Sequence, residues 1–464
     1  MRRIFVFFTP LIALVALPLL AIGSAQSTAF TSIVSADENN CQIAVSLPDA
    51  GLVEVNSGQG LRHVITQEGM IPISDSGDPA LQGLIWSMEI PATAGVEYQM
   101  DYEIELLENI DLLPQASDHP DEEMVLSNLW QEDRFYPEAI LTVSDPAIAR
   151  NHRLVQVALT PYQYNPVTRQ LRVYRDIQVD FTFAGVNEIN QVKLTLPRSA
   201  TYENLLRHNV LNYEAMNQNA RDYDLNLGLD PILYIYDSSI ESYLEPLLEW
   251  KRQKGQVVYT ATQTQVSLGT YSSVKNYITD AYNNWDNPPV FVTLVGDPSY
   301  CSFTDVAPSN STGDHDYSRL EGGDMLGDVF VGRLSVSNAT MLMNVVNKQL
   351  GYEKTPYMAD PSWMSSAHLY ADSNSASGWS TAFTSENIKH KMVNNGVTNV
   401  TDCYAHECGT PEATSISAAF NNGIGYFNYR GYWYMNGWTN THASNLTNGY
   451  MVPFVVDITC STGD

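Results

Sequence analysis

The chain has 464 residues, of which 44% are hydrophobic and 11% aromatic, so it is long enough for two or three domains with substantial cores. It carries 24 lysines and arginines against 52 aspartates and glutamates, a formal net charge of −28. A surface this acidic repels nucleic acid and anionic membranes, which argues against both as partners.

The first 25 residues have the pattern of an export signal. Arg2 and Arg3 form a positive start, residues 4–22 are uncharged and mostly apolar, and residues 23–25 are small enough for signal peptidase. The alternative is an uncleaved membrane anchor. Later in the chain no stretch approaches ~20 uninterrupted apolar residues. We therefore expect a secreted, extracellular protein that starts at Gln26 and spans no membrane.

Residues 26–183 show the short segments of a β-rich domain, with apolar residues at alternate positions and turn signals between the segments. Strands at this spacing predict a β-sandwich-like fold. No catalytic constellation is visible in this region. The expected strands are 84–90, 98–106, 155–160, 170–175 and 178–183.

Residues 184–228 form a polar connection with little sustained apolar pattern and one possible helix around 202–212. We expect an exposed linker, and its basic residues Arg198, Arg207 and Arg221 would then be open to proteolytic cleavage.

Residues 229–464 alternate hydrophobic strands with amphipathic helices. This alternation predicts an α/β domain with a largely parallel sheet covered by helices on both faces. The expected strands are 232–236, 257–259, 290–295, 329–333, 368–371, 425–428 and 453–458, and the later helices are 274–285, 339–352, 385–394 and 413–421. An earlier helix is expected between Ser238 and Gly255.

The last of these strands carries the most distinctive chemistry. A β-branched run that starts at Pro453 ends at Cys460, where the strand gives way to a loop. Parallel α/β sheets present catalytic side chains outside the carboxyl ends of their strands. A thiolate there is a candidate nucleophile, provided that a base or a positive charge lowers its pKa. The preceding strand ends at a similar place with Gly431 and Tyr432.

The other cysteines have more ordinary interpretations. Cys403 and Cys408 are close enough in sequence to form a disulfide, or they are two free thiols. A metal site with His406 is a further alternative, although a structural zinc site needs four ligands and no fourth is nearby. Cys41 and Cys301 have no evident partners.

Several segments in the same order resemble the gingipain family of cysteine endopeptidases, a branch of the caspase-like clan. In the second half the similar segments are 247–255, 292–297, 327–333, 446–448 and 453–460, and in the first half residues 134–183 are similar to the family's propeptide. The resemblance implies a zymogen in which a β-rich propeptide restrains a caspase-like α/β domain.

The resemblance also assigns the candidate catalytic positions. Cys460 matches the nucleophile, and Gly431 matches the glycine that precedes the catalytic histidine. Tyr432 stands in the histidine position, and a phenol with a reference pKa of about 10 is a poor base at neutral pH. His442, in the next loop, is the nearest substitute base; its alternative role is that of a surface or capping residue. Backbone amides would still supply an oxyanion hole.

The resemblance implies no cofactor for catalysis, but possible structural calcium. The candidate ligands are Asp314, Asp316, Asp324 and Asp328, whose spacing does not match an EF-hand, and a solvated acidic loop is the alternative. Asp316 has a further possible role in a pocket for a basic substrate side chain.

We therefore expect four parts: a signal peptide (1–25), a propeptide domain (26–183), a linker (184–228) and a peptidase domain (229–464). Family members continue past the nucleophile, so the peptidase domain is expected to be incomplete at Asp464. The expected partners are protein or peptide substrates and the chain's own propeptide as an intramolecular inhibitor. A catalytically silent homologue, acting as an extracellular binding or scaffolding module, is the alternative function.

Overall fold

The structure is a computed structural model. It describes residues 30–47, 51–56, 60–67, 69–116, 125–193, 196–217, 229–267, 270–297, 313–372, 380–405, 407–435 and 437–460. The expected signal peptide therefore lies outside the described residues. The chain divides into two compact units, one of residues 1–116 with 124–339 and one of residues 117–123 with 340–464. Each unit is described by itself below, and the boundaries of the four expected parts stay predictions.

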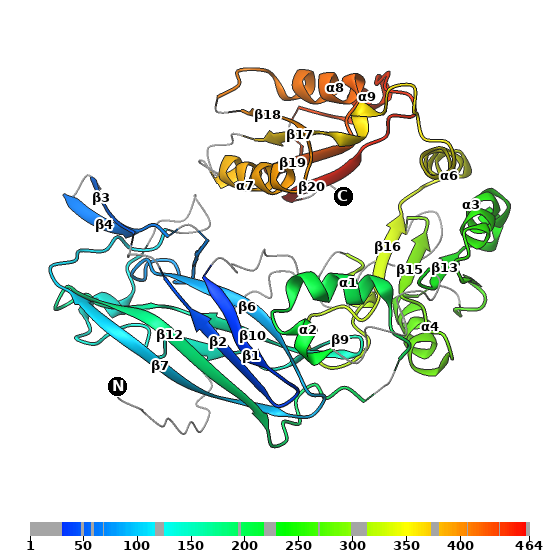
Figure 1. The fold of residues 1–464 in the computed structure, drawn as a ribbon. Coiled ribbons are helices and arrows are strands. Elements are labelled where there is room, and N and C mark those ends of the chain that lie inside the picture. The colour runs from blue at the N-terminus through cyan, green and yellow to red at the C-terminus, as the bar shows by residue number, and fades with distance from the viewer. Residues whose placement is uncertain are drawn as a thin grey trace. The chain divides into compact units, whose positions relative to one another are not determined.

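The amino-terminal half of the first unit is built from antiparallel strands (Figure 1). Two five-stranded sheets contain most of them: β12 joins β2, β7 and β11 with β1 at the edge, whereas β10 joins β6, β8 and β9 with β5 at the edge. The strands are β1 (Thr31–Ala36), β2 (Asn40–Val45), β3 (Leu52–Asn56), β4 (Leu61–Ile65), β5 (Ile71–Pro72), β6 (Gln82–Ile90), β7 (Gly95–Leu107), β8 (Leu141–Val143), β9 (Ala147–Ala149), β10 (His152–Leu159), β11 (Tyr162–Asn165) and β12 (Gln170–Ala184), and a 3-10 helix η1 spans Asn128–Gln131.

One hydrophobic core joins the two sheets. Ile43 and Val179 from the first sheet and Trp86 and Val157 from the second belong to the same buried cluster. Side chains that alternate along each strand supply this core, as in a β-sandwich. The predicted strand-rich amino-terminal region is therefore confirmed.

The expected linker is partly folded. Helices α1 (Ala200–Asn209) and α2 (Tyr213–Met216) follow Ser199, whose side chain accepts a hydrogen bond from the Tyr202 backbone amide and caps α1. Tyr202 and Leu206 are almost fully buried. The helix expected around 202–212 is present as α1, but the exposed position expected for this segment was wrong, because Tyr202 and Leu206 pack into a hydrophobic cluster. Residues 218–228, with Arg221, lie outside the described residues.

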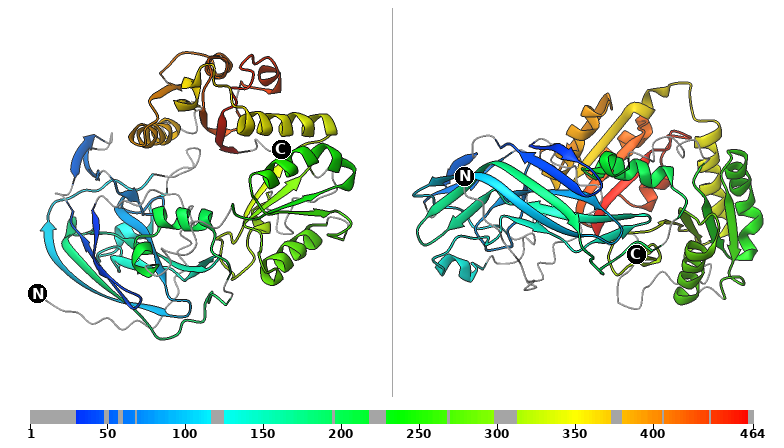
Figure 2. Two further views of the ribbon diagram at one scale, coloured as in Figure 1. Left: turned by 45° about the vertical axis from the view of Figure 1, so that its right-hand side comes forward. Right: turned by 60° about the horizontal axis from the view of Figure 1, so that its bottom comes forward.

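A parallel sheet completes the first unit. Its elements are β13 (Ile232–Tyr236), η3 (Ser238–Ile240), α3 (Glu241–Gln253), β14 (Val258–Thr262), α4 (Tyr271–Asn284), β15 (Phe291–Val295), η4 (His315–Tyr317) and β16 (Phe330–Leu334). The strand order is β14-β13-β15-β16. The chain passes from β13 outward to β14 and then back past β13 to β15. Because each crossover is right-handed, α3 and α4 lie on opposite faces of the sheet (Figure 2).

The second unit contains a second parallel sheet, of order β18-β17-β19-β20. Its elements are α6 (Ala339–Lys354), η5 (Pro361–Ser365), β17 (Ser366–Ala371), α7 (Ser380–Asn394), β18 (Asn399–Tyr404), α8 (Glu412–Asn422), β19 (Tyr426–Trp433), α9 (Asn440–Ser444) and β20 (Phe454–Cys460). By the same crossover rule, α7 covers one face and α8 the other. None of the described helices has the length and apolar character needed to cross a membrane.

The α/β character of residues 229–464 is confirmed, but the parallel strands form two four-stranded sheets instead of one. Hydrophobic runs show which strands are buried without showing which strands are neighbours. Strand β18 was not expected, because Asn399, Thr401 and Asp402 interrupt its apolar pattern and it lies at the sheet edge.

Candidate active site

The second sheet reverses its winding direction between β17 and β19. The chain moves outward from β17 to β18 and then returns past β17 to β19. Open α/β sheets bind ligands outside the carboxyl ends of their strands at such a switch point. Asp372 directly follows β17, and Gly431 lies near the end of β19, so both are at this edge.

A β-bulge brings the candidate catalytic positions to the same place. Arg430 pairs with Ile458 and Trp433 pairs with Cys460, so Gly431 and Tyr432 together face the single residue Thr459. Bulges of this kind change the direction of a strand and are common beside active sites. The backbones at 432 and 460 therefore lie on adjacent strands at one edge of the sheet. The side chains of Tyr432 and Cys460 are outside the described part of the structure, and their catalytic roles stay predictions.

The bulge requires glycine at position 431. A Cβ atom there would lie 2.6 Å from the ring atom Cε1 of Tyr429, closer than real Cβ contacts. Tyr429 is fully buried and stacks on Tyr370, with ring centroids 5.8 Å apart. The tyrosine ring thus supports the backbone that leads into position 432.

His442 caps a helix. It lies at the third position of α9, and its Nδ1 atom accepts a hydrogen bond of 3.1 Å from the backbone amide of Thr439. The hydroxyl of Thr439 lies 3.0 Å from the same nitrogen. These contacts match the capping role, and a role of His442 as base stays a prediction. His368 is buried and bonds to Thr401 and Ser415, and burial lowers its pKa to about 4, so it is a neutral core residue.

The structure tests the predictions for three of the cysteines. Cys403 and Cys408 form a disulfide, which confirms the first of the alternatives and excludes both free thiols and the zinc site for these two residues. Cys41 is free and buried in the strand-rich core, where burial raises the pKa of its thiol to about 12. His406 and Cys301 lie outside the described residues.

The four calcium candidates have separate partners. Asp314 forms a two-pronged ion pair with Arg333, at 2.9 and 2.8 Å, and Asp316 pairs with Arg319 and Tyr271. Among the described residues no three histidine, cysteine or acidic side chains gather as a metal site requires. Calcium binding and a substrate pocket at Asp316 both stay predictions.

The other two, Asp324 and Asp328, hold the strand-rich half onto the first parallel sheet. Asp324 accepts a hydrogen bond of 3.0 Å from the Ile148 amide. Asp328, with no exposed surface, accepts hydrogen bonds from the amides of Leu320 and Glu321 and, at 3.3 Å, from that of Arg150. Burial raises the pKa of Asp328 to about 7, although these amides favour the ionised form.

The Arg150 side chain completes this contact. Its guanidinium is almost fully buried, donates to the carbonyl oxygens of Pro289 and Pro288, and lies 5.7 Å from the centre of the Tyr282 ring. Residues 288–289 precede β15, so the contact is at the amino ends of the strands, opposite the edge at which parallel sheets bind ligands. A mixed hydrophobic cluster from both halves surrounds it: Ala149, Leu154, Tyr202, Leu206, Val210, Tyr213 and Val290.

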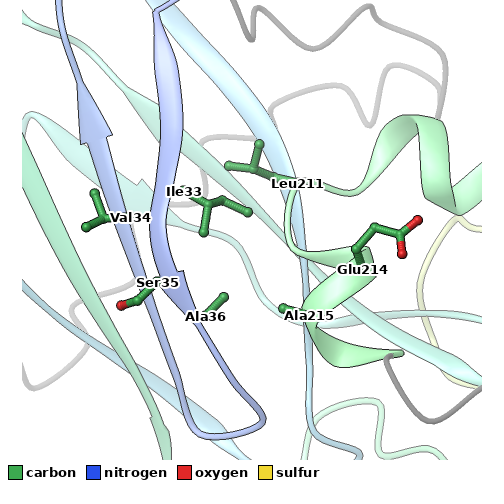
Figure 3. A pocket seen from close by; sticks show the side chains of 7 residues that line it. All are labelled: Ile33, Val34, Ser35, Ala36, Leu211, Glu214 and Ala215. Carbon is green, nitrogen blue, oxygen red and sulfur yellow. The ribbon is translucent and has the colours of Figure 1, made fainter.

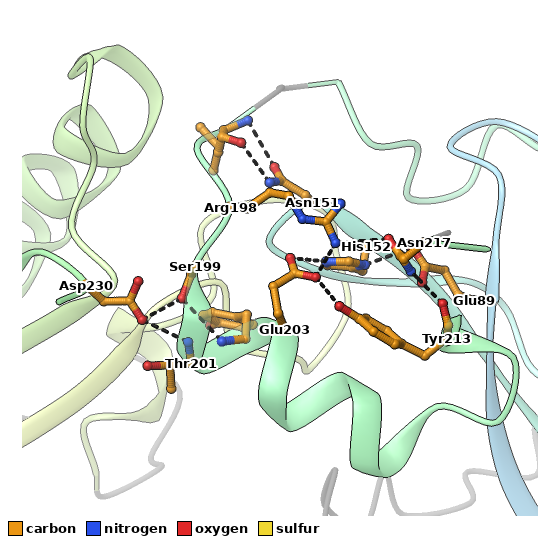
Figure 4. Close-up of polar contacts among 12 residues, drawn as sticks. Glu89, Asn151, His152, Arg198, Ser199, Thr201, Glu203, Tyr213, Asn217 and Asp230 are labelled. Atoms are coloured by element: carbon orange, nitrogen blue, oxygen red, sulfur yellow. Dashed lines mark hydrogen bonds and ion pairs between the residues drawn. The ribbon is translucent and has the colours of Figure 1, made fainter. Parts of the chain in front are cut away.

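A buried ionic network fixes α1 and α2 to the strand-rich half (Figure 4). His152 lies 2.8 Å from a Glu89 oxygen and 3.1 Å from a Glu203 oxygen, and Glu203 also contacts Arg198 and Tyr213. Burial opposes a charge on His152, but its hydrogen bonds to the two carboxylates raise its pKa to about 9. Burial likewise opposes the charge on Glu203, but hydrogen bonding to His152 helps to lower its pKa to about 2. The sequence placed His152 in the propeptide but gave no sign of its two distant partners.

A shallow pocket of about 530 Å³ lies between β1 and α2 (Figure 3). Of its seven lining residues only Ser35 and Glu214 carry polar side-chain atoms; the others are Ile33, Val34, Ala36, Leu211 and Ala215. Glu214 is the single ionisable group in this lining, and it has no nucleophile beside it, so the pocket does not have the groups of a catalytic site.

Sequence reasoning also missed Glu412, the first residue of α8. Burial raises its pKa to about 8, and the negative charges of Asp372 and Asp457 act in the same direction. A glutamate at a helix start is ordinarily a surface residue that favours the helix dipole, so nothing in the sequence indicated a buried carboxyl group.

Comparison with known proteins supplies the class that this arrangement suggests. Residues 230–464 match peptidase family C25, and residues 26–220 match the propeptide of that family. The chain therefore belongs to the C25 family of cysteine peptidases and carries the family's propeptide region. This confirms the resemblance to gingipains.

Among individual proteins, the chain is 27% identical to gingipain R2 of Porphyromonas gingivalis over 93% of its own length and 60% of that protein. It is 24% identical to Lys-gingipain of the same organism over 94% of its own length and 27% of that protein. The chain thus spans about three-fifths of gingipain R2 and less of the other.

Two solved structures are also similar. The Arg-specific cysteine proteinase gingipain R is 23% identical, with a TM-score of 0.45 over 51% of this chain and 55% of that one. A complex of the pro- and mature domains of RgpB from Porphyromonas gingivalis is 26% identical, with a TM-score of 0.36 over 40% of this chain and 98% of that one.

Proposed function

We propose that the chain is the precursor of a secreted cysteine endopeptidase with a caspase-like catalytic domain. The main support is the position of Cys460, at the carboxyl end of β20 and one residue beyond the point that faces the bulge at Gly431 and Tyr432, within the region that matches the peptidase family. The apolar, cleavable pattern of residues 1–25 supports export.

The proposed reaction is acyl transfer through a thioester. The Cys460 thiolate attacks the carbonyl carbon of a peptide bond, and the carbonyl electron pair moves onto oxygen. Backbone amides of Cys460 and of the Gly431 turn donate hydrogen bonds to that oxyanion. The oxyanion then re-forms the carbonyl as the carbon–nitrogen bond breaks, and the amine leaves with a proton taken from water. The hydroxide that remains attacks the thioester and releases the acid and the Cys460 thiolate.

The propeptide is proposed to act as an intramolecular inhibitor. The match of residues 26–220 to the family's propeptide supports this role, as does the solved complex of pro- and mature domains of a related protein. Hydrogen bonds from the buried residues Arg150 and Tyr202 bind the propeptide region to the part of the chain that contains the first parallel sheet. We therefore expect the propeptide to stay bound after the chain between the two has been cleaved.

A catalytically silent homologue is the second candidate. Tyr432 favours it, because a phenol at the expected histidine position donates a hydrogen bond far more readily than it accepts a proton at neutral pH. In this case the fold would serve as an extracellular binding or scaffolding module.

Hydrolysis by the complete natural chain distinguishes the two candidates. The precursor is expected to degrade unfolded casein or a mixed peptide library once the propeptide has been cleaved and removed. Cys460→Ala should abolish this activity, whereas Glu407→Gln, at an exposed residue of the peptidase region, should retain it. No hydrolysis by the processed wild-type chain would favour the silent module.

A further inference from the structure

The chain that follows the bulge at Gly431 and Tyr432 packs against one buried carboxyl group, that of Glu412. Glu412 is only 8% exposed, and its Oε1 atom is buried with no hydrogen-bond partner among the described residues. The Tyr429 hydroxyl and the Trp438 backbone amide are the hydrogen-bonding neighbours of its carboxyl group. Its carboxyl carbon also lies 3.9 Å from the position that a Cβ atom of Gly437 would occupy.

These contacts link Glu412 to both ends of the segment. At the near end, the Tyr429 ring lies under Gly431 and its hydroxyl donates to the carbonyl of Tyr434 at 3.3 Å. At the far end, Trp438 stacks on Phe420 of α8, 5.6 Å between ring centroids, and donates to Ser417 at 3.2 Å.

We propose that Glu412 is a positioning residue, which holds the segment 431–438 through Tyr429 and the Trp438 amide and so places position 432 beside the end of β20. The proposal deepens the proposed function and rests on it, since it concerns the same site. Glu412 itself takes no part in bond making or breaking.

The charges around Glu412 define how this support responds to pH. Asp372 after β17 and Asp457 on β20 are negative, and Tyr429 and Tyr370 are the titratable groups of β19 and β17 beside it. Hydrogen bonding with Tyr429 and Trp438 favours the ionised acid, but burial and the two negative charges outweigh it. A neutral Glu412 therefore suits the site, and ionisation adds a third negative charge. Because the pKa is raised from 4.5 to about 8 in the folded state, the support is complete below about pH 4.5 and weakens as the pH rises to about 8, with little further change above.

Glu412→Gln and Glu412→Ala test this support. Glutamine copies the neutral acid in size and hydrogen bonding, and alanine removes it. Amide hydrogen exchange of residues 431–438 should quicken in the wild type, relative to Glu412→Gln at the same pH, by up to about tenfold per pH unit between pH 5 and 8. At pH 5 and at pH 8, the amides of this segment should exchange faster in Glu412→Ala than in Glu412→Gln. The exposed Glu407→Gln should behave like the wild type.

Equal exchange in wild type and Glu412→Gln across this pH range would overturn the proposal, as would an unchanged segment in Glu412→Ala. The rate at which iodoacetamide alkylates Cys460 separates this outcome from the fate of the proposed function. A slow Cys460 in every variant would contradict the proposed nucleophile, while the exchange data would still decide the role of Glu412.

Discussion

Tyr432 is the residue that, under the proposed function, most directly limits catalysis. It stands where the family resemblance places a histidine, and the bulge sets its backbone on the strand beside Cys460. Tyr432→His is expected to raise the rate of peptide hydrolysis by about 10²-fold or more, because a positioned imidazole contributes ~10²–10⁴ as a general base. Tyr432→Phe is the matched control and should bring no gain. A Tyr432→His chain with unchanged hydrolysis would argue against a latent dyad.

His152 gives the first unit a pH dependence that can be measured. Its pKa is raised from 6.5 to about 9, so its stabilising charge is fully present below about pH 6.5 and is lost as the pH rises through 9. Glu203, lowered from 4.5 to about 2, contributes fully above pH 4.5 and is lost toward pH 2. The network is therefore at full strength from about pH 4.5 to 6.5.

His152→Gln should destabilise the first unit at pH 6, on the order of 2–3 kcal/mol, and reduce its loss of stability between pH 6 and 9. Urea unfolding at both pH values measures this effect. His208→Gln, the same change at an exposed histidine of α1, serves as control and should leave both values near wild type. Equal unfolding of His152→Gln and wild type at pH 6 would contradict the network's contribution.

At the scale of elements, helix α1 joins the propeptide half to the first parallel sheet. Leu206 is fully buried in the mixed hydrophobic cluster, whereas its neighbour Leu205 is only partly covered. Leu206→Ala should cost about 2–5 kcal/mol, since it removes buried methyl groups and leaves a cavity. Leu205→Ala should cost less. Faster hydrogen exchange of α1 in the first variant alone would support this packing, and equal effects would contradict it.

The sequence predicted elements better than their arrangement. The runs at 232–236 and 290–295 were recognised as strands, because fully buried parallel strands are nearly continuous in apolar residues. The bulge at 431–432 was not foreseen, since it depends on the register between two strands and on the Tyr429 ring beneath Gly431. Register and close approach are properties of the folded chain, and no local pattern encodes them.

Some residues of the candidate site could likewise be predicted from the sequence, and others could not. Cys460 and Gly431 could be found from the end of a strand and a family resemblance. Glu412 could not, because its buried environment comes from Asp372, Tyr429 and Asp457, which are 17 to 45 positions away in the sequence. A reactive side chain can be recognised in a sequence by its residue type. A shifted pKa cannot, because it depends on which groups lie beside the side chain in the folded protein.

At the scale of the whole molecule, the account depends on Cys460 being an activated thiol. Cys403 and Cys408 are bonded to each other and are internal controls in the processed chain, whereas Cys41, buried in the propeptide region with its pKa raised to about 12, is the control in the uncleaved precursor. The decisive measurement is the rate at which iodoacetamide alkylates each cysteine, followed by peptide mapping from pH 5 to 10, in the precursor and again after removal of its propeptide. The account predicts that Cys460 reacts first, with an apparent pKa below about 7.5. A Cys460 that stays unmodified, or that titrates like an ordinary thiol near pH ~8.5, would contradict it.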